Sequence, residues 1–399
     1  MAAELSYVLI TPYSLMKSRT GGIIARLLSR TDLDLIGAQV LTFTRELAAQ
    51  YAASLEKSVS PANPKTAKLL SDYVKENFTE REDGKRERVM MLLFRGEDAC
   101  KKLYEIVGSL SGKPRKDSPT GETIRDTYSD LVADKDNSDK IRYFEPAVLT
   151  PPDFASAVER LKMFADYTEK SKNIVENVVG VEEGDERTLV ILKPENWRHP
   201  STKPGNIIDM LSRTGLRLVG CKIYRMSVAE ALEFYGPVKE ALRKKLAPKI
   251  GEKAKEMLEK EFEIKMNPQV IEKLTETVGF TFADDQFSKI VEFMSGRRPD
   301  SCPVSEMSDP GLAKCMVLIY EGKEAIAKIR NVLGPTDPTK APGGTVRRDF
   351  GHDVMVNTAH ASDAPESVVR EMKIVKIDKN ELSSKIQEFL QKYESVKQQ

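Results

Sequence analysis

A histidine near the end of the chain has the surroundings of a nucleophile. The apolar run at 354–356 predicts a short strand, and His360 follows it after a brief interval. Asp363 and Glu366 have the spacing of a capping box, with a proline between them where a first helical turn tolerates one. His360 is therefore expected just ahead of a helix N-terminus, whose free N–H groups and dipole favour an anion. Such an imidazole could accept a phosphoryl group, although by itself this stretch fits an inert loop histidine better.

Composition and charge narrow the class of protein. The chain has 399 residues, enough for two or three domains with their own cores. Lys plus Arg number 62 and Asp plus Glu 61, so bulk charge does not suggest a nucleic-acid or membrane partner. No apolar run reaches membrane-spanning length, and the N-terminus lacks a signal-peptide pattern. The four cysteines are far apart without a CxxC pair, which favours reduced thiols. We therefore expect a soluble cytoplasmic protein.

An internal repeat determines the fold that we expect. Residues 6–37 have the pattern of strand, helix and strand, and residues 188–220 repeat it with a shared Leu-Ser-Arg-Thr, a following Leu-x-Leu and a closing glycine. The match continues in the apolar runs 89–94 and 315–320 and in the helices that follow them. Two α+β domains of the ferredoxin-like β-α-β-β-α-β type, with additions, are therefore predicted.

The second half carries two segments that the first half lacks. A helical insertion at 237–285 has charges of both signs, which is typical of solvated helical faces. A terminal helix at 380–399 has leucines and an isoleucine along one face and is expected to pack on the body of the second domain. The expected boundaries are 1–167 for the first domain, 168–187 for a polar linker and 188–399 for the second domain.

Five motifs of the second half occur in the order and spacing of a known family. They are Lys193-Pro194-Glu195, the turn from Arg330 to Pro338, the stretch from Thr345 to Phe350, the segment from Asn357 to Asp363, and the trailing Glu366 and Glu371. With these motifs the second half resembles a nucleoside diphosphate kinase. The match covers roughly 188–372 apart from the insertion, and more faintly 6–167. Glu195 replaces the family's usual aspartate, Ala361 its usual glycine, and Pro342 stands one residue early.

The resemblance implies a role for each of these positions. His360 would be the nucleophile that becomes phosphohistidine, and Glu371, with Ser362 acting through it, would orient the ring. Mg²⁺ would arrive with the nucleotide, with ATP as a phosphate donor. The residues implied to hold the phosphates and ribose are Lys193, Arg330, Thr336, Arg347 and Asn357.

Two aromatic residues lie on either side of the insertion, Tyr235 before it and Phe287 after it. The resemblance implies that Tyr235 supports the site and that Phe287 stacks on the base. Because the insertion lies between them, packing in the core is the alternative for both, and for Phe287 it is an equal one.

The residue types suit phosphoryl transfer. A neutral imidazole is nucleophilic near pH 7, and a hydrogen bond at one ring nitrogen decides which nitrogen attacks. Transfer otherwise needs in-line positioning and donors or cations over the phosphate oxygens, which two arginines, a lysine and a helix N-terminus would supply.

The first half has lost these residues. Thr11 stands in the place of Lys193, Tyr104 in that of Arg330 and Leu149 in that of His360, while Arg125 remains opposite Arg347. A leucine cannot accept a phosphoryl group, so we expect this domain to be inactive. The family assembles as oligomers built on dimers, so the two repeats could pack as a pseudo-dimer, and a homo-oligomer is possible.

We therefore expect a nucleoside diphosphate kinase that works by a ping-pong scheme through phosphorylated His360. One alternative is a nucleotide-binding regulatory or scaffold protein in which the insertion blocks turnover. Another is a protein-histidine phosphotransfer relay that uses the same His360. The base preference stays open.

Overall fold

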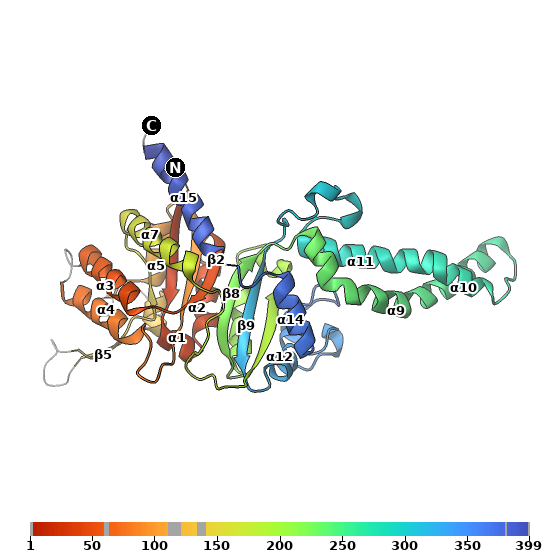
Figure 1. Cartoon of the computed structure of the whole chain (residues 1–399). Coiled ribbons are helices and arrows are strands. Elements are labelled where there is room, and N and C mark those ends of the chain that lie inside the picture. Colours follow the sequence, from red (N-terminus) through yellow and green to blue (C-terminus); the bar gives the residue numbers. More distant parts are fainter. Residues whose placement is uncertain (1–2, 60–63, 111–120, 134–140, 380, 398–399) are drawn as a thin grey trace. The chain divides into compact units, whose positions relative to one another are not determined.

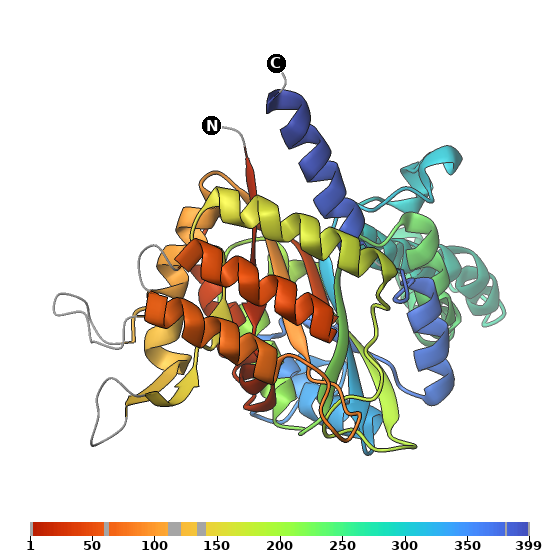
Figure 2. The same ribbon diagram turned by 60° about the vertical axis from the view of Figure 1, so that its left-hand side comes forward.

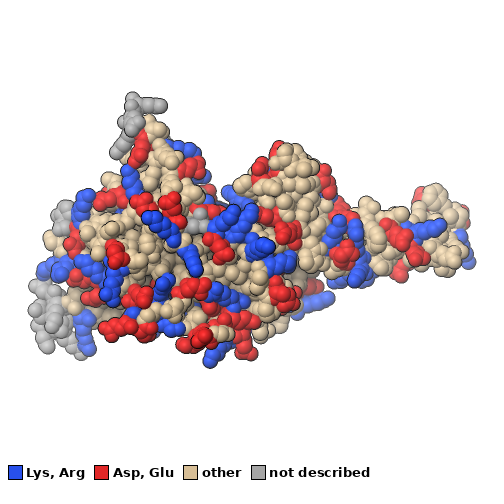
Figure 3. All heavy atoms as spheres, viewed as in Figure 1, with Lys and Arg blue, Asp and Glu red and all other residues tan. Residues whose placement is uncertain are grey.

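Two four-stranded antiparallel sheets organise most of the chain (Figure 1). The computed structural model describes residues 3–59, 64–110, 121–133, 141–379 and 381–397. They form two compact units, one made of residues 224–315 and one made of the chain on either side of that segment. The sheets belong to the larger unit. On the face shown in Figure 3, basic and acidic side chains are interspersed, in agreement with their near-equal numbers in the sequence.

The first sheet has the strand order β2-β3-β1-β6. All of its neighbouring strands are antiparallel, and Tyr7 pairs with Leu93 at the centre. Every residue from Val89 to Phe94 is fully buried, which explains why this strand appears in the sequence as a continuous apolar run. The strands are β1 (Glu4–Ile10), β2 (Asp34–Leu41), β3 (Val89–Gly96) and β6 (Val148–Leu149), and a separate two-stranded sheet joins β4 (Asp130–Ala133) to β5 (Ile141–Glu145).

Helices cover both faces of the first sheet. Leu5, Tyr7 and Leu9 of β1 share one cluster with α3, α4 and α7, which lie side by side in Figure 2. Helix α5 packs on β1 as well, and α2 contacts α5. The helices are α1 (Pro12–Met16), α2 (Thr20–Ser29), α3 (Arg45–Val59), α4 (Pro64–Asn77), α5 (Ala99–Val107), α6 (Ile124–Tyr128) and α7 (Phe154–Lys170).

The second sheet has the order β10-β7-β9-β8, so its strands follow the same spatial order as those of the first sheet when each set is numbered along the chain. Its strands are β7 (Glu186–Leu192), β8 (Arg217–Tyr224), β9 (Cys315–Gly322) and β10 (Ala359–Ala361). Its helical segments in the larger unit are η1 (Pro194–Trp197), α8 (Lys203–Ser212), α12 (Ala325–Leu333), η5 (Pro338–Lys340), α13 (Val346–Phe350) and α14 (Pro365–Ile374). The α+β class with antiparallel sheets is therefore confirmed.

The two halves meet where Gly21 of α2 and Gly205 of α8 approach each other. A Cβ atom at Gly21 would lie 2.5 Å from the Gly205 carbonyl oxygen, and one at Gly205 would lie 2.3 Å from that of Gly21. Ala25 and Asp209 complete the contact, since a Cβ atom at Gly205 would lie 2.4 Å from the Ala25 nitrogen and one at Gly21 would lie 2.5 Å from the Asp209 nitrogen. The helices approach so closely that a side chain at either glycine would collide with backbone.

The terminal helix α15 (Leu382–Lys397) packs on the first half, so the expectation that it covers the second half is wrong. Leu382, Ile386 and Leu390 belong to the apolar cluster of β1, α3, α4 and α7. Helix α15 also contacts α7 and β2. An apolar stripe predicts that a helix is buried but not which surface buries it, and here that surface belongs to the first half. Residues 380, 398 and 399 of the predicted helix lie outside the described residues.

Replacing Ile386 by alanine is expected to destabilise the protein by about 2–5 kcal/mol, because the side chain is fully buried in the cluster of the first half. Urea unfolding followed by circular dichroism measures this loss. Gln391→Ala, at an exposed position of the same helix, should leave the unfolding free energy within about 0.5 kcal/mol of wild type. Equal effects of the two changes would contradict the packing of α15.

The smaller unit is built on one long helix. α9 (Val228–Phe262) runs through Pro237 and Pro248 and begins at a capping box of Ser227 and Glu230. It packs along α11 (Phe280–Ser295), and glycines at 251 and 279 allow close approach. The expected insertion at 237–285 therefore lies within the stretch from the start of α9 to the end of α11. The unit also contains α10 (Val270–Leu274), a π-helical turn η2 (Thr275–Gly279), η3 (Pro299–Ser301) and η4 (Val304–Glu306). None of the helices in the described ranges is both long and apolar enough for a membrane crossing.

Candidate active site

His360 lies on strand β10 itself, paired with Ile191 of β7. The expected strand at 354–356 is wrong, because that segment forms turns in which Val354 is 62% exposed. The Asp353 carboxylate accepts hydrogen bonds from the N–H groups of Met355 (2.7 Å) and Val356 (2.8 Å). A side chain that occupies these backbone donors favours a turn over a strand. The ladder therefore forms a few residues later, and it fixes the backbone of His360 directly.

A buried glutamate holds the imidazole. His360 Nε2 lies 2.8 Å from Glu371 Oε2, and Ser362 Oγ donates to the same oxygen at 2.7 Å. Glu371 comes from α14 and its side chain is 4% exposed, whereas that of His360 is 25% exposed. Because the carboxylate accepts from Nε2, we assign the proton to Nε2, which leaves the lone pair on Nδ1. The structure thus brings His360, Glu371 and Ser362 together, with the Nε2 atom of the ring against the carboxylate.

The start of α14 differs from the expected capping box. Its N-cap is Ala364, whose side chain makes no capping bond, and Pro365 occupies the first turn. Asp363 instead accepts from Ser367 Oγ at 2.7 Å. This hydrogen bond lowers the pKa of Asp363, and the charge of Arg330 acts in the same direction. Arg330, an exposed residue in the last turn of α12, therefore lies within electrostatic reach of the site.

Lys193 is buried beside the site. Its side-chain nitrogen donates to Asn357 Oδ1 at 3.0 Å and to the Met355 carbonyl oxygen. Burial lowers the pKa of Lys193 to about 8, while the charges of Glu195 and Asp353 oppose this shift and Arg347 adds to it. The ammonium is thus held in a place where it is costly to keep charged, a feature common at functional sites.

Asn357 connects the lysine to the phosphate-binding turn expected at 330–338. Its Nδ2 donates to the carbonyl oxygens of Thr336 (3.1 Å) and Val354 (2.8 Å), and the residue is 4% exposed. Thr336 itself is exposed. Asn357 therefore positions Lys193 and the turn through contacts that the sequence alone did not indicate.

Arg347 ties two backbone segments together. It donates to the Gly334 carbonyl oxygen at 2.8 Å and to that of Ala359, next to His360, at 2.9 Å. Arg125 makes the equivalent bonds in the first half, to Gly108 (2.5 Å) and Val148 (3.0 Å). An arginine survives in the first half because it holds the same two segments there. Its retention therefore does not require phosphate binding.

Arg125 and Arg347 make equivalent contacts, so replacing each by lysine gives a pair of variants that can be compared directly. Arg125→Lys and Arg347→Lys should each destabilise the protein by about 1–3 kcal/mol, since a lysine cannot reach both carbonyl oxygens in a fork and one is left unsatisfied. Only Arg347→Lys should also slow phosphorylation of His360. Thermal unfolding and single-turnover labelling measure the two effects, and equal slowing by both variants would contradict the assignment.

Tyr235 and Phe287 belong to the smaller unit. Phe287 is 5% exposed, with the Lys239 side-chain nitrogen 5.7 Å from the ring centroid. Tyr235 is 9% exposed, and its ring centroid lies 4.9 Å from that of Phe234. Burial of this kind agrees with the packing alternative for both residues.

In the first half, the position that corresponds to His360 is occupied by a buried leucine. Leu149 pairs with Leu9 as His360 pairs with Ile191, and it is 1% exposed. Arg160 stands opposite Glu371 in the repeat and is fully buried, with Nε 2.7 Å from Ser54 Oγ. A cation therefore replaces the carboxylate that would have to orient a histidine.

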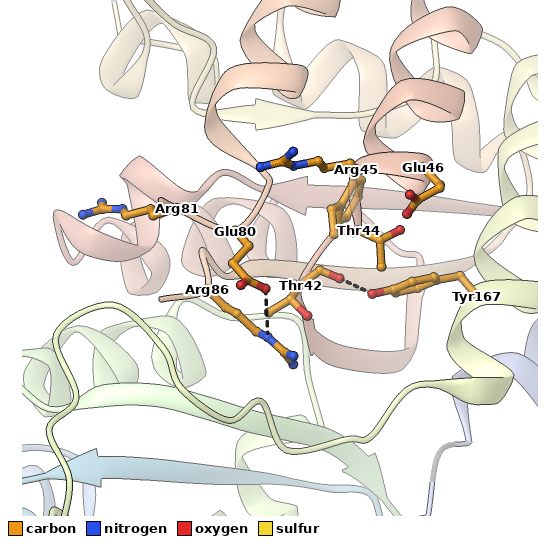
Figure 4. A pocket seen from close by; sticks show the side chains of 9 residues that line it. Thr42, Thr44, Arg45, Glu46, Glu80, Arg81, Arg86 and Tyr167 are labelled. Atoms are coloured by element: carbon orange, nitrogen blue, oxygen red, sulfur yellow. Dashed lines mark hydrogen bonds and ion pairs between the residues drawn. The ribbon is translucent and has the colours of Figure 1, made fainter. Parts of the chain in front are cut away.

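A pocket of about 370 Å³ opens elsewhere in the first half, beside the start of α3 (Figure 4). Two of its arginines have acidic partners, since Arg81 Nε lies 2.6 Å from Glu87 and Arg86 Nε 3.7 Å from Glu80. Tyr167 donates to the Thr42 carbonyl oxygen at 2.5 Å. None of the residues equivalent to the His360 group lines this pocket, so it is not a remnant of the site.

Comparison with known proteins identifies the family. The family model of nucleoside diphosphate kinase matches residues 302–380. A nucleoside diphosphate kinase from Cereibacter sphaeroides is 30% identical over 187 residues, covering 47% of this chain and 90% of that protein. One from Staphylothermus marinus is 29% identical over 190 residues, covering 48% and 92%. The crystal structure of an NDP kinase from Pyrobaculum aerophilum is 25% identical, covers 48% of this chain and 94% of that chain, and superposes with a TM-score of 0.32. This chain belongs to the nucleoside diphosphate kinase family.

Proposed function

We propose that this chain is a nucleoside diphosphate kinase whose phosphoryl group passes through His360. The observation that carries the proposal is the contact of His360 Nε2 with the buried Glu371, which leaves Nδ1 as the nucleophile. Membership of the kinase family and the buried Lys193 nearby support it. Phosphoryl transfer asks little more of a protein than such a nucleophile and well-placed cations.

The reaction has two balanced half-steps. Nδ1 attacks the γ-phosphorus of a nucleoside triphosphate such as ATP, the bond to the β–γ bridging oxygen breaks, and a nucleoside diphosphate leaves. In the second step a terminal oxygen of another diphosphate attacks the same phosphorus and Nδ1 leaves with its lone pair. The Nε2 proton stays against Glu371 throughout, where the carboxylate stabilises the cationic ring of the phosphohistidine.

The remaining site residues are proposed to bind the substrate. Lys193 and Arg330 balance the charge of the phosphates, and Thr336 and Asn357 contact phosphate and ribose. Arg347 aligns the segments that carry them. Tyr235 and Phe287 are assigned to the nucleoside by resemblance, and a rise of KM in Phe287→Ala tests that assignment.

Mg²⁺ is proposed to accompany the nucleotide. Within the described ranges no group of three or more His, Cys, Asp and Glu side chains is arranged to hold a metal, whereas Mg²⁺ binds readily to nucleotide phosphates. When bound it would neutralise part of the phosphate charge.

The two halves are proposed to be ferredoxin-like domains at 1–167 and 188–399, joined through 168–187, with only the second active. The common strand order supports this division, and α15 is then a segment of the second domain that packs on the first. The reciprocal contact of Gly21 and Gly205 supports a pseudo-dimer, in which the inactive copy takes a partner's place. The four cysteines, all within the described residues, form no disulfide, and three of them are buried, which supports a cytoplasmic protein.

Labelling with radioactive ATP tests the function. The protein should acquire an acid-labile label that GDP then removes as GTP. No label on the protein would overturn both the kinase and a phosphotransfer relay. A label that nucleoside diphosphates leave in place would instead favour the relay.

A further inference from the structure

The turn after β7 forms hydrogen bonds with Thr358, a residue with a strained backbone two positions before His360. Thr358 has a φ of +73°, a left-handed backbone conformation that is costly for a β-branched residue. Its carbonyl oxygen accepts from the Lys193 N–H at 2.9 Å and from Asn196 Nδ2 at 2.7 Å. Its N–H donates to Glu195 Oε1 at 2.8 Å. Both backbone polar groups of this buried residue are therefore held by η1 and the residue before it, and this fixes where β10 begins.

The first half has equivalent hydrogen bonds around a left-handed residue, but they are made by different residues. Ala147 has a φ of +62°, and its N–H donates to Glu145 Oε1 at 3.0 Å. Its carbonyl oxygen accepts from the Thr11 N–H at 3.2 Å and from Ser14 Oγ at 3.0 Å. A carboxylate thus accepts from the N–H of the left-handed residue in both halves. This contact by itself is therefore a feature of the common fold and does not indicate catalysis.

The two carboxylates differ in what else they contact. Glu145 comes from β5 and accepts from the hydroxyl groups of Thr11 (2.7 Å) and Tyr73. Glu195 comes from the turn that carries Lys193, and its charge favours the protonated lysine. Its second oxygen, Oε2, is buried without a hydrogen-bond partner among the described residues. A buried carboxylate oxygen without a donor is stabilised chiefly by a neighbouring positive charge.

We propose that Glu195 is a positioning residue with two functions: it holds Thr358, and thereby His360, in place, and it keeps Lys193 charged for the incoming phosphates. This inference rests on the proposed kinase function. The charged groups that act on Lys193 are Glu195 and Asp353, which favour its positive charge, and Arg347, which opposes it. Of the two carboxylates, Glu195 accepts from the N–H of Thr358, two residues before His360, whereas Asp353 accepts from Met355 and Val356.

Glu195→Gln separates the charge from the contact, because the amide oxygen can still accept from the Thr358 N–H. The alkaline fall of kcat/KM reports the loss of the Lys193 proton in the free enzyme. Without the carboxylate this fall should move to lower pH by at least about half a unit. Glu195→Asp, which restores the charge, should move it back. An unchanged profile in Glu195→Gln would overturn the electrostatic function.

Glu145→Gln is the matched control. It alters the equivalent carboxylate in the inactive half, so it should lower the melting temperature and leave the pH profile unchanged. An equal shift of the profile in this variant would contradict a specific role for Glu195.

Hydrogen exchange tests the contact without any turnover. In Glu195→Ala the amide of Thr358 loses its acceptor and should exchange at least about tenfold faster than in wild type. If the Thr358 amide stays protected in Glu195→Ala, the proposal that Glu195 holds Thr358 is wrong. If wild type forms no phosphoenzyme, the proposed function fails, while the exchange of this amide still decides whether Glu195 holds Thr358.

Discussion

Replacing His360 by glutamine is expected to abolish the phosphoenzyme and to reduce nucleoside diphosphate kinase activity below detection. Glutamine can still contact Glu371 but has no lone pair on nitrogen that could attack phosphorus. The first half offers no substitute, because its equivalent residue is the buried Leu149. Incorporation of label from ATP measures the effect.

The other two histidines are the controls for this change. The chain contains three histidines, and His199 and His352 are exposed. His199→Gln and His352→Gln should therefore keep the label and the activity of wild type. Label that persists in His360→Gln, or disappears in either control, would show that the nucleophile has been wrongly assigned.

Replacing Lys193 by methionine is expected to lower kcat/KM by about 10²–10³, the usual cost of removing one electrostatic contact to a transition state. Methionine is of similar length and can remain buried, so the change removes mainly charge. In wild type the ammonium is the protonated form and burial brings its pKa to about 8, so kcat/KM should fall as the pH rises through 8. In the variant this fall should vanish.

Lys222→Met is the control for Lys193, because Lys222 is also a buried lysine. It bonds the carbonyl oxygens of Val375 and Lys376 and lies 2.8 Å from Glu381, in the segment that leads to α15. Its loss should lower stability without altering the pH profile. A profile with the same alkaline fall in Lys193→Met would contradict the assignment of that fall to Lys193.

The motifs grouped three residues that side-chain contacts join in the structure, whereas the position of the strand near His360 was predicted wrongly. The motifs placed Lys193, His360, Ser362 and Glu371 in one group. In the structure His360 and Ser362 both contact Glu371, while the Lys193 side chain contacts Asn357. The strand that carries His360 was misplaced because Asp353 takes the N–H groups of the residues after it, a local competition that apolar periodicity does not reveal.

Contacts over long sequence distances could not be predicted. The apolar face of α15 indicated burial, yet its partner surface lies more than two hundred residues earlier. The comparison of the repeats showed that Arg125 survives, but only the bonds to Gly108 and Val148 show why. Likewise, Glu145 and Glu195 occupy unrelated positions in the repeat, so their common contact with a left-handed residue appears only in the folded chain.

The position of the phosphoryl group on the ring tests the account most directly. Phosphorus NMR of the chain after reaction with ATP distinguishes phosphate on Nδ1 from phosphate on Nε2. The contact between Nε2 and Glu371 predicts a single phosphohistidine at Nδ1 of His360, which disappears when GDP is added. Phosphate on Nε2, or on any residue other than His360, would contradict the account.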